Sequence, residues 1–318
     1  MSEYAVDLDA AHEASRRLAG VAHRTPIATC ATLDTLAGRR LYFKCEHLQK
    51  VGAFKFRGAY NALMKLSDQI AASGVVTHSS GNHGQALALA AKLRGIQAHI
   101  VMPRTVIASK RKAVEGYGSH VVTCEPSLEA REETANEVLL DTGGVLVHAY
   151  DHPDIIAGQA TVALELLEQM PALDAIVAPV GGGGLVSGIC IAAKSINPQI
   201  RIFAAEPAGA DDTARSKLAG KRILQTAPKT IADGLLTSLG DLTWPIIRDH
   251  VEHVITVSEN EIVTAMRLIW ERAKLLIEPS AAVAVAAVLT DTFKTLKGIH
   301  RAAVVLSGGN VDLDHLPW

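Results

Sequence analysis

Residues 175–190 read AIVAPVGGGGLVSGIC, a short apolar run that ends in four glycines and continues as a stretch of small apolar residues. This order predicts a buried strand, a tight turn and a helix, which is the repeating unit of a parallel α/β fold. Glycines leave backbone N–H groups accessible, and the helix dipole behind them favours negative charge, so the turn predicts a phosphate site. The alternative is a flexible strand-to-helix turn. Neither a Walker A lysine nor a complete GxGxxG register is present.

The same alternation extends along the chain. Runs rich in β-branched residues predict nine strands, at residues 40–45, 75–78, 98–102, 120–124, 145–148, 175–179, 201–205, 253–257 and 302–306. Nine strands are too many for one minimal nucleotide-binding sheet, and no linker or internal repeat marks a boundary. We therefore expect two domains, one inserted into the other.

Composition excludes several classes of protein. Of the 318 residues, 48% are hydrophobic, and 31 Lys and Arg nearly balance 33 Asp and Glu, which argues against disorder and against nucleic acid as a partner. The four cysteines are far apart, so we expect neither a disulfide framework nor a zinc site. No signal peptide or long apolar segment is apparent, so we expect a cytoplasmic protein with no membrane partner.

A second candidate segment is THSSGNHGQALALAAKL at residues 77–93. Ser79, Asn82 and His83 would place side-chain donors beside the free N–H groups at a helix start, so the turn could hold a carboxylate. The alternative is that Ser80 or Asn82 merely caps the helix.

A third segment, GAFKFRGA at residues 52–59, places Lys55 between two phenylalanines. An amine held against aromatic rings and beside the cation of Arg57 should have a lowered pKa, which makes it a competent nucleophile toward a carbonyl group. The alternative is a solvated surface lysine.

Two further segments follow predicted strands. Ser307, in VVLSGGNVDL, stands where open α/β sheets bind ligands and could hydrogen-bond a ring nitrogen, or it could begin an ordinary turn. Glu206, Asp211 and Asp212, in AAEPAGADD, offer the oxygen ligands that Mg²⁺ or Ca²⁺ prefer, or they are solvated loop acids.

In this order, the segments resemble the pyridoxal 5'-phosphate (PLP) enzymes of fold type II. The resemblance is closest to the family of serine racemases and serine/threonine dehydratases, which includes 3-hydroxyaspartate dehydratases, and it covers nearly the whole chain. It is carried by GAFKFRGAYNAL, SSGNHGQALALAAKL, IAGQATVALELL, PVGGGGLVSGI, IADGL, ERAKLLIEPSAA and LSGGNVDL. It implies two open, mostly parallel twisted sheets flanked by helices, and a homodimer. It also implies a large PLP-binding domain at residues 1–75 and 149–318 and a small mobile domain at 76–148.

The resemblance also implies roles for single residues. Lys55 would bind the cofactor aldehyde and act as the catalytic base, and Ser80 would face the substrate from the opposite side. The implied cofactor-binding residues are Phe54, Lys55, Asn82, Gly181, Gly182, Gly183, Gly184, Leu185 and Ser307. The implied substrate-binding residues are Ser79, Asn82, His83 and Arg131, and the implied ligands of a divalent cation (Mg²⁺ or Ca²⁺) are Glu206, the carbonyl of Ala210, and Asp212.

Departures from the family pattern bear on the substrate, a small amino acid. Tyr150 stands where animal racemases have asparagine, and Val51 replaces a threonine that helps to hold ATP there, which puts activation by ATP in doubt. We expect β-elimination from an L-β-hydroxy amino acid, such as 3-hydroxyaspartate, serine or threonine, to a 2-oxo acid and ammonia. Serine racemase is the alternative. A non-catalytic ligand sensor would have no need of an imine-forming amine such as Lys55. The incomplete GxGxxG register argues against a nicotinamide-dependent oxidoreductase.

Overall fold

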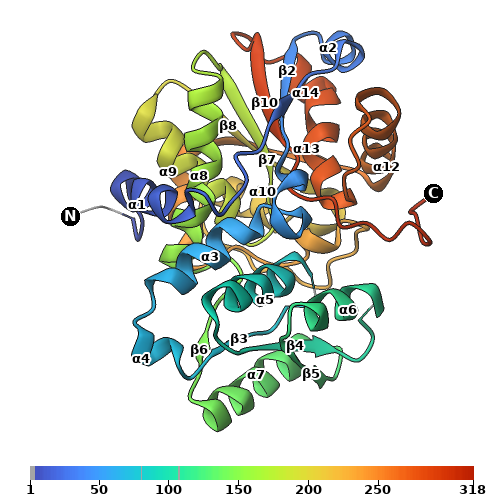
Figure 1. Cartoon of the computed structure of the whole chain (residues 1–318). Helices are drawn as coiled ribbons and strands as arrows, with labels where there is room; N and C mark the ends of the chain where they lie inside the picture. The colour runs from blue at the N-terminus through green and yellow to red at the C-terminus, as the bar shows by residue number, and fades with distance from the viewer. Residues whose placement is uncertain (1–3, 80, 107) are drawn as a thin grey trace.

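The computed structural model describes residues 4–79, 81–106 and 108–318, which form an α/β fold with two twisted sheets (Figure 1). The larger sheet has the order β1-β2-β10-β7-β8-β9, and every neighbouring pair is parallel except β1 with β2. Its strands are β1 (Ile27–Ala28), β2 (Arg40–Lys44), β7 (Ala175–Pro179), β8 (Arg201–Pro207), β9 (Val251–Val257) and β10 (Arg301–Val305).

The smaller sheet is wholly parallel and has the order β5-β4-β3-β6. Its strands are β3 (Val75–Thr77), β4 (Ala98–Pro103), β5 (His120–Cys124) and β6 (Val145–Leu146). All nine strands expected from the sequence are present, and the fold class is confirmed. The strand that the sequence pattern missed is β1, because two residues make no apolar run of their own.

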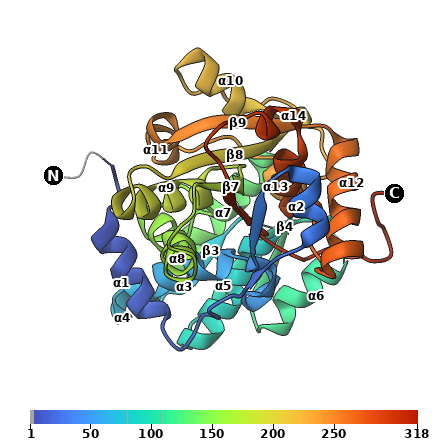
Figure 2. The ribbon, with the colours of Figure 1, turned by 90° about the horizontal axis from the view of Figure 1, so that it is seen from above.

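Helices cover both sheets on both faces (Figures 1 and 2). They are α1 (Leu8–Leu18), α2 (Ala31–Ala37), α3 (Lys55–Lys65), α4 (Asp68–Ala71), α5 (Asn82–Arg94), α6 (Ala108–Gly116), α7 (Leu128–Thr142), α8 (Pro153–Gln169), α9 (Gly184–Ile196), α10 (Asp212–Ala219), α11 (Thr243–His250), α12 (Glu259–Leu268), α13 (Pro279–Leu289) and α14 (Asp291–Lys294). Short 3-10 turns occupy Glu46–Leu48, Lys50–Gly52, Ala208–Ala210 and Asp233–Leu235, and a π-helical turn occupies Ile269–Ala273. None of the described helices is long and apolar enough to cross a membrane.

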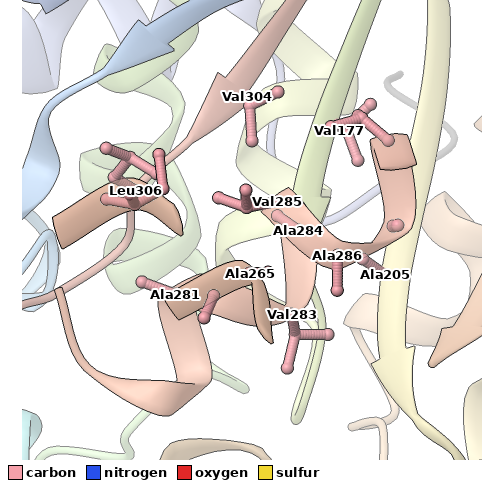
Figure 3. Close-up of a cluster of buried hydrophobic side chains, with 14 of the residues drawn as sticks. Val177, Ala205, Ala265, Ala281, Val283, Ala284, Val285, Ala286, Val304 and Leu306 are labelled. Carbon is pink, nitrogen blue, oxygen red and sulfur yellow. The ribbon is translucent and has the colours of Figure 1, made fainter. Parts of the chain in front are cut away.

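The core of the larger sheet lies on both of its faces. Alternate residues of β7 point to opposite sides: Val177 packs with the α13 side chains, whereas Ile176 packs with α8 and α9. Figure 3 shows Val177, Val304 and Leu306 of the sheet beside Val283 to Ala286 of α13. Residues 280–288 of α13 are all buried, because their small side chains let the helix lie close against the sheet.

Helix α3, which begins at Lys55, lies between the two sheets (Figure 1). Its Phe56 and Leu63 pack with α5 against the smaller sheet. Its other side crosses α8 almost backbone to backbone, since a Cβ added at Gly158 would lie 2.5 Å from the Cα of Gly58. This close crossing holds the start of α3, and with it Lys55, against the larger sheet.

Candidate active site

The segments that follow the carboxyl ends of β3, β6, β7 and β10 meet between the two sheets. They bring together residues 78–79, 81–83, 147–151, 180–184 and 306–310, which is where ligands bind in open α/β folds. Their contacts with one another, given below, place most of the residues singled out by sequence at one site.

Lys55 lies at the centre of these segments. Its Nζ donates to the carbonyl oxygen of Ala149 at 2.6 Å and lies 5.3 Å from the centre of the Phe54 ring. Burial lowers the pKa of Lys55 to about 8, because the ammonium form loses its hydration. A larger fraction of Lys55 than of an exposed lysine is therefore a neutral, nucleophilic amine near neutral pH, a shift in the direction that the sequence pattern predicted.

The cause of this lowered pKa differs in part from the expectation. Arg57 does not act on Lys55: its guanidinium turns away to the carboxylates of Glu46 and Glu165, and burial alone accounts for the shift. Phe56 is buried on the far side of the helix, where its ring faces Lys50 rather than Lys55. Residues one or two apart on a helix do not share a face, which explains both differences.

The four glycines form a rigid, buried turn rather than a flexible one. Gly183 adopts the left-handed conformation, with φ of 90°, and α9 begins at Gly184. Among the hydrogen bonds of the described residues, none uses the N–H of Gly182, Gly183, Gly184 or Leu185 as donor. Unpaired N–H groups at a helix start fit an anion such as the phosphate of PLP.

The turn is glycine-rich because its neighbours leave no space for side chains. A Cβ at Gly182 would lie 2.3 Å from the ring of Tyr150, and one at Gly181 would lie 3.0 Å from the Cα of Leu235. Tyr150 is thus part of the site, in contact with the glycine turn and next to the carbonyl that accepts from Lys55.

Asn82 does not cap its own helix. The N-cap of α5 is Gly81, and the Asn82 side chain instead donates to Glu278 Oε1 at 2.8 Å and accepts from Asn310 Nδ2 at 2.8 Å. Burial, and secondarily the charge of Asp233, raises the pKa of Glu278 to about 8. This cluster fixes the amide of Asn82 and leaves one of its two N–H groups for a ligand oxygen.

The remaining residues of the predicted carboxylate site are not all joined by hydrogen bonds. Ser79 Oγ accepts the N–H of Gly81 at 3.4 Å. Arg131, on α7, has a buried Nε without a partner among the described residues. Burial lowers the pKa of His78, and the charge of Arg131 adds to this effect. No hydrogen bond of the described residues links Arg131 to Ser79, Asn82 or His83. Ser80 lies outside the described residues.

His83 offers an acceptor rather than a donor. Its Nε2 lies 3.1 Å from the carbonyl oxygen of Val147, which can only accept, so Nε2 carries the proton and Nδ1 is a bare, buried acceptor. Burial, followed by the charge of Lys55, lowers the pKa of His83 to about 3, so the ring stays neutral. This geometry suits a hydroxyl or amine of a substrate better than its carboxylate.

Ser307 directly adjoins the lysine segment. It follows β10, and its carbonyl accepts the N–H of Phe54 at 3.1 Å, while Ala53 pairs with Gly308. Because β10 and β7 are parallel neighbours, Ser307 stands at the same edge of the sheet as the glycine turn.

Glu206, near the end of β8, and Asp212 are buried rather than solvated, whereas Asp211 is partly exposed and pairs with Arg215. Glu206 accepts from the N–H groups of Thr213 and Ala214, each at 2.9 Å, and Asp212 accepts from Leu239 at 3.4 Å. Burial raises the pKa of Glu206 to about 8 and that of Asp212 to about 6. Two buried carboxylates fit a hard divalent cation. Within the described ranges, no three Asp, Glu, His or Cys side chains form a metal-binding group.

Sequence reasoning assigned no role to Glu278 or Asn310, although both stand in segments that carried the resemblance. A buried Glu before the Pro of α13 and an Asn after two glycines were the available signals. Thr243, which contacts the glycine turn, gave no local signal at all.

Comparisons with known proteins agree with this geometry. The model of the family described as pyridoxal-phosphate dependent enzymes matches residues 18–308. A serine racemase of Arabidopsis thaliana is 53% identical over 317 residues, which cover 99% of this chain and 96% of that protein. A beta-hydroxyaspartate dehydratase of Paracoccus denitrificans is 50% identical over 312 residues, 98% of each chain. The structure of maize serine racemase matches with a TM-score of 0.97 and 51% identity, covering 98% of this chain and 95% of that one.

Proposed function

Because this chain belongs to the family of pyridoxal-phosphate dependent enzymes, we propose that it is an ammonia-lyase that acts on an L-β-hydroxy amino acid. The Cα proton and the β-hydroxyl leave as water, and hydrolysis of the released enamine yields a 2-oxo acid and ammonia. The observation that carries the proposal is the buried amine of Lys55, whose pKa is lowered, placed among the unpaired N–H groups of the glycine turn, Ser307 and the acceptor His83.

The residues around Lys55 have separate roles in holding the cofactor and moving the proton. PLP, when bound, supplies the electron sink that stabilises negative charge at Cα. Lys55 Nζ holds the cofactor and then removes the Cα proton, and the N–H groups of Gly182 to Leu185 hold the phosphate. Asn82 and Ser307 orient the ring, with Phe54 beside it.

The substrate is held by the segment after β3 and by α7. Ser79, Asn82 and Arg131 bind the carboxylate, and Nδ1 of His83 accepts from the amine or the β-hydroxyl of the substrate. The dehydratase relative supports 3-hydroxyaspartate as a substrate, with serine or threonine sharing the reacting atoms. A second candidate function is serine racemisation, which the serine racemase relatives favour. In that reaction Ser80 would return the proton from the opposite face.

Several broader features belong to the same proposal. A divalent cation, Mg²⁺ or Ca²⁺, binds at Glu206, Ala210 and Asp212. The enzyme works as a cytoplasmic homodimer without activation by ATP. Residues 76–148 move as a small domain relative to 1–75 and 149–318, supported by the confinement of the smaller sheet to residues 75–146.

Absorbance and product release test the proposal together. We expect purified protein to show the near-visible absorbance of lysine-bound PLP, and Lys55→Ala to lose it together with activity. A panel of L-serine, L-threonine and 3-hydroxyaspartate isomers, assayed for 2-oxo acid and for inversion at Cα, separates dehydratase from racemase. A protein that takes up no PLP, or that inverts serine without releasing 2-oxo acid, would refute the assignment.

A further inference from the structure

A second segment, residues 239–243, lies directly behind the glycine turn. It joins η4, the 3-10 turn at Asp233–Leu235, to α11 and contacts the turn through both backbone and side chain. A Cβ at Gly183 would lie 2.9 Å from the Cδ2 of Leu239 and 2.9 Å from the Cβ of Thr243. The segment therefore forms the wall that supports the turn on the side away from its free N–H groups.

Thr243 makes the decisive polar contact. Its side chain is fully buried, and its hydroxyl donates to the carbonyl oxygen of Gly182 at 2.8 Å while accepting the N–H of Gly240 at 2.8 Å. In a planar trans peptide, the carbonyl of one residue and the N–H of the next point in opposite directions. Holding the Gly182 carbonyl toward Thr243 therefore directs the Gly183 N–H toward the anion side of the turn.

Asp151 anchors the supporting segment in turn. Its two carboxylate oxygens accept the N–H groups of Asp241 and Leu242, each at 2.9 Å. A Cβ at Gly240 would lie 2.1 Å from the Cγ of Asp151, so the carboxylate lies directly against this backbone. Asp151 is also two residues from Ala149, whose carbonyl accepts from Lys55.

We propose that Thr243 is a positioning residue for the cofactor phosphate and that Asp151 holds in place the segment of residues 239–243, which includes Thr243. The inference deepens the proposed function and rests on it, because it takes the anion of the glycine turn to be the phosphate of PLP. Neither residue touches the cofactor: each acts by fixing the orientation of the Gly182–Gly183 peptide. Loss of either residue should therefore weaken binding of the phosphate and leave binding of the pyridine ring unchanged.

The test compares two ligands on matched variants. Dissociation constants of PLP and of pyridoxal, which lacks the phosphate, are measured on apoenzyme of wild type, Thr243→Val and Thr243→Ser. Valine keeps the shape of threonine and removes the hydroxyl, whereas serine keeps the hydroxyl. We expect Thr243→Val to bind PLP about tenfold more weakly with unchanged pyridoxal affinity, because the Gly182 carbonyl loses the shorter of its two hydrogen bonds and keeps only the one from the Gly240 N–H at 3.4 Å. We expect Thr243→Ser to retain most of the PLP affinity.

Asp151→Asn provides an independent arm if Thr243→Val does not fold, since an amide can accept only one of the two N–H groups and opposes the other. We expect the same selective loss of PLP affinity. If PLP and pyridoxal affinities fall equally, these residues have a merely structural role and the proposal is wrong. Unchanged PLP affinity in the tested variants would also overturn the proposal. Wild-type protein that binds neither ligand would instead refute the proposed function itself.

Discussion

Arg57 holds together a buried ion network directly behind Lys55. Its Nε and Nη2 donate to the two carboxylate oxygens of Glu46, each at 2.8 Å, and its Nη1 and Nη2 donate to Glu165 at 2.6 and 2.8 Å. Lys44 completes the network with a contact to Glu165 at 2.8 Å. Two cations thus balance two carboxylates, and Arg57→Met would leave the fully buried Glu46 without its cation.

The magnitude follows from the burial of the pair. Removing one partner of a buried ion pair typically costs about 3–5 kcal/mol, because the other charge stays desolvated. An entropy of unfolding of about 2.1 cal/mol/K per residue gives roughly 0.7 kcal/mol/K for a chain of this length, so Tm should fall by about 4–8 °C. Glu165 should contribute less to the loss, because it keeps Lys44.

Thermal unfolding followed by circular dichroism measures this effect. The matched control is Arg24→Met, which removes the same side chain from a pair with Glu168 whose partners are 56% and 63% exposed. An exposed pair contributes at most about 1 kcal/mol, so Tm of the control should change by less than about 2 °C. Equal shifts in the two variants would refute the reasoning that burial makes the Arg57 network costly to break.

Three other outcomes are expected. Burial lowers the pKa of Lys55 from 10.5 to about 8, so the rate of PLP uptake by apoenzyme should rise with pH and level off above about 8; a plateau only near 10.5 would contradict this. Burial raises the pKa of Glu206 from 4.5 to about 8 and of Asp212 from 3.8 to about 6, so the folded protein retains protons that the unfolded chain releases. In EDTA, Tm should therefore fall as the pH rises toward 8, and added Mg²⁺ should raise Tm most at the upper end of this pH range. A Tm in EDTA that does not change with pH would contradict this expectation. Arg131→Ala should raise KM for the amino acid by roughly tenfold without changing the PLP absorbance, and loss of that absorbance would make Arg131 structural.

Local sequence patterns were sufficient for nine of the ten strands in the described part of the chain and for singling out residues that stand at strand ends. Apolar runs bounded by Gly, Pro or Ser predicted nine strands, and the glycine turn, Lys55 and Ser307 could each be found from their own neighbours. These features depend on residues within one turn of chain, so their physical cause is contained in the local sequence. The order of strands in each sheet was not, because pairing joins distant segments.

The tertiary structure decided how those residues are held. Asn82 meets Glu278 across 196 positions of sequence, and Thr243 meets Gly182 across 61. The pKa of Lys55 is lowered by enclosure between the two sheets, whereas Arg57, the cation that stands nearest in sequence, faces the other way. Burial and long-range hydrogen bonding are properties of the packed chain, and no local pattern of residue types specifies which distant groups will meet.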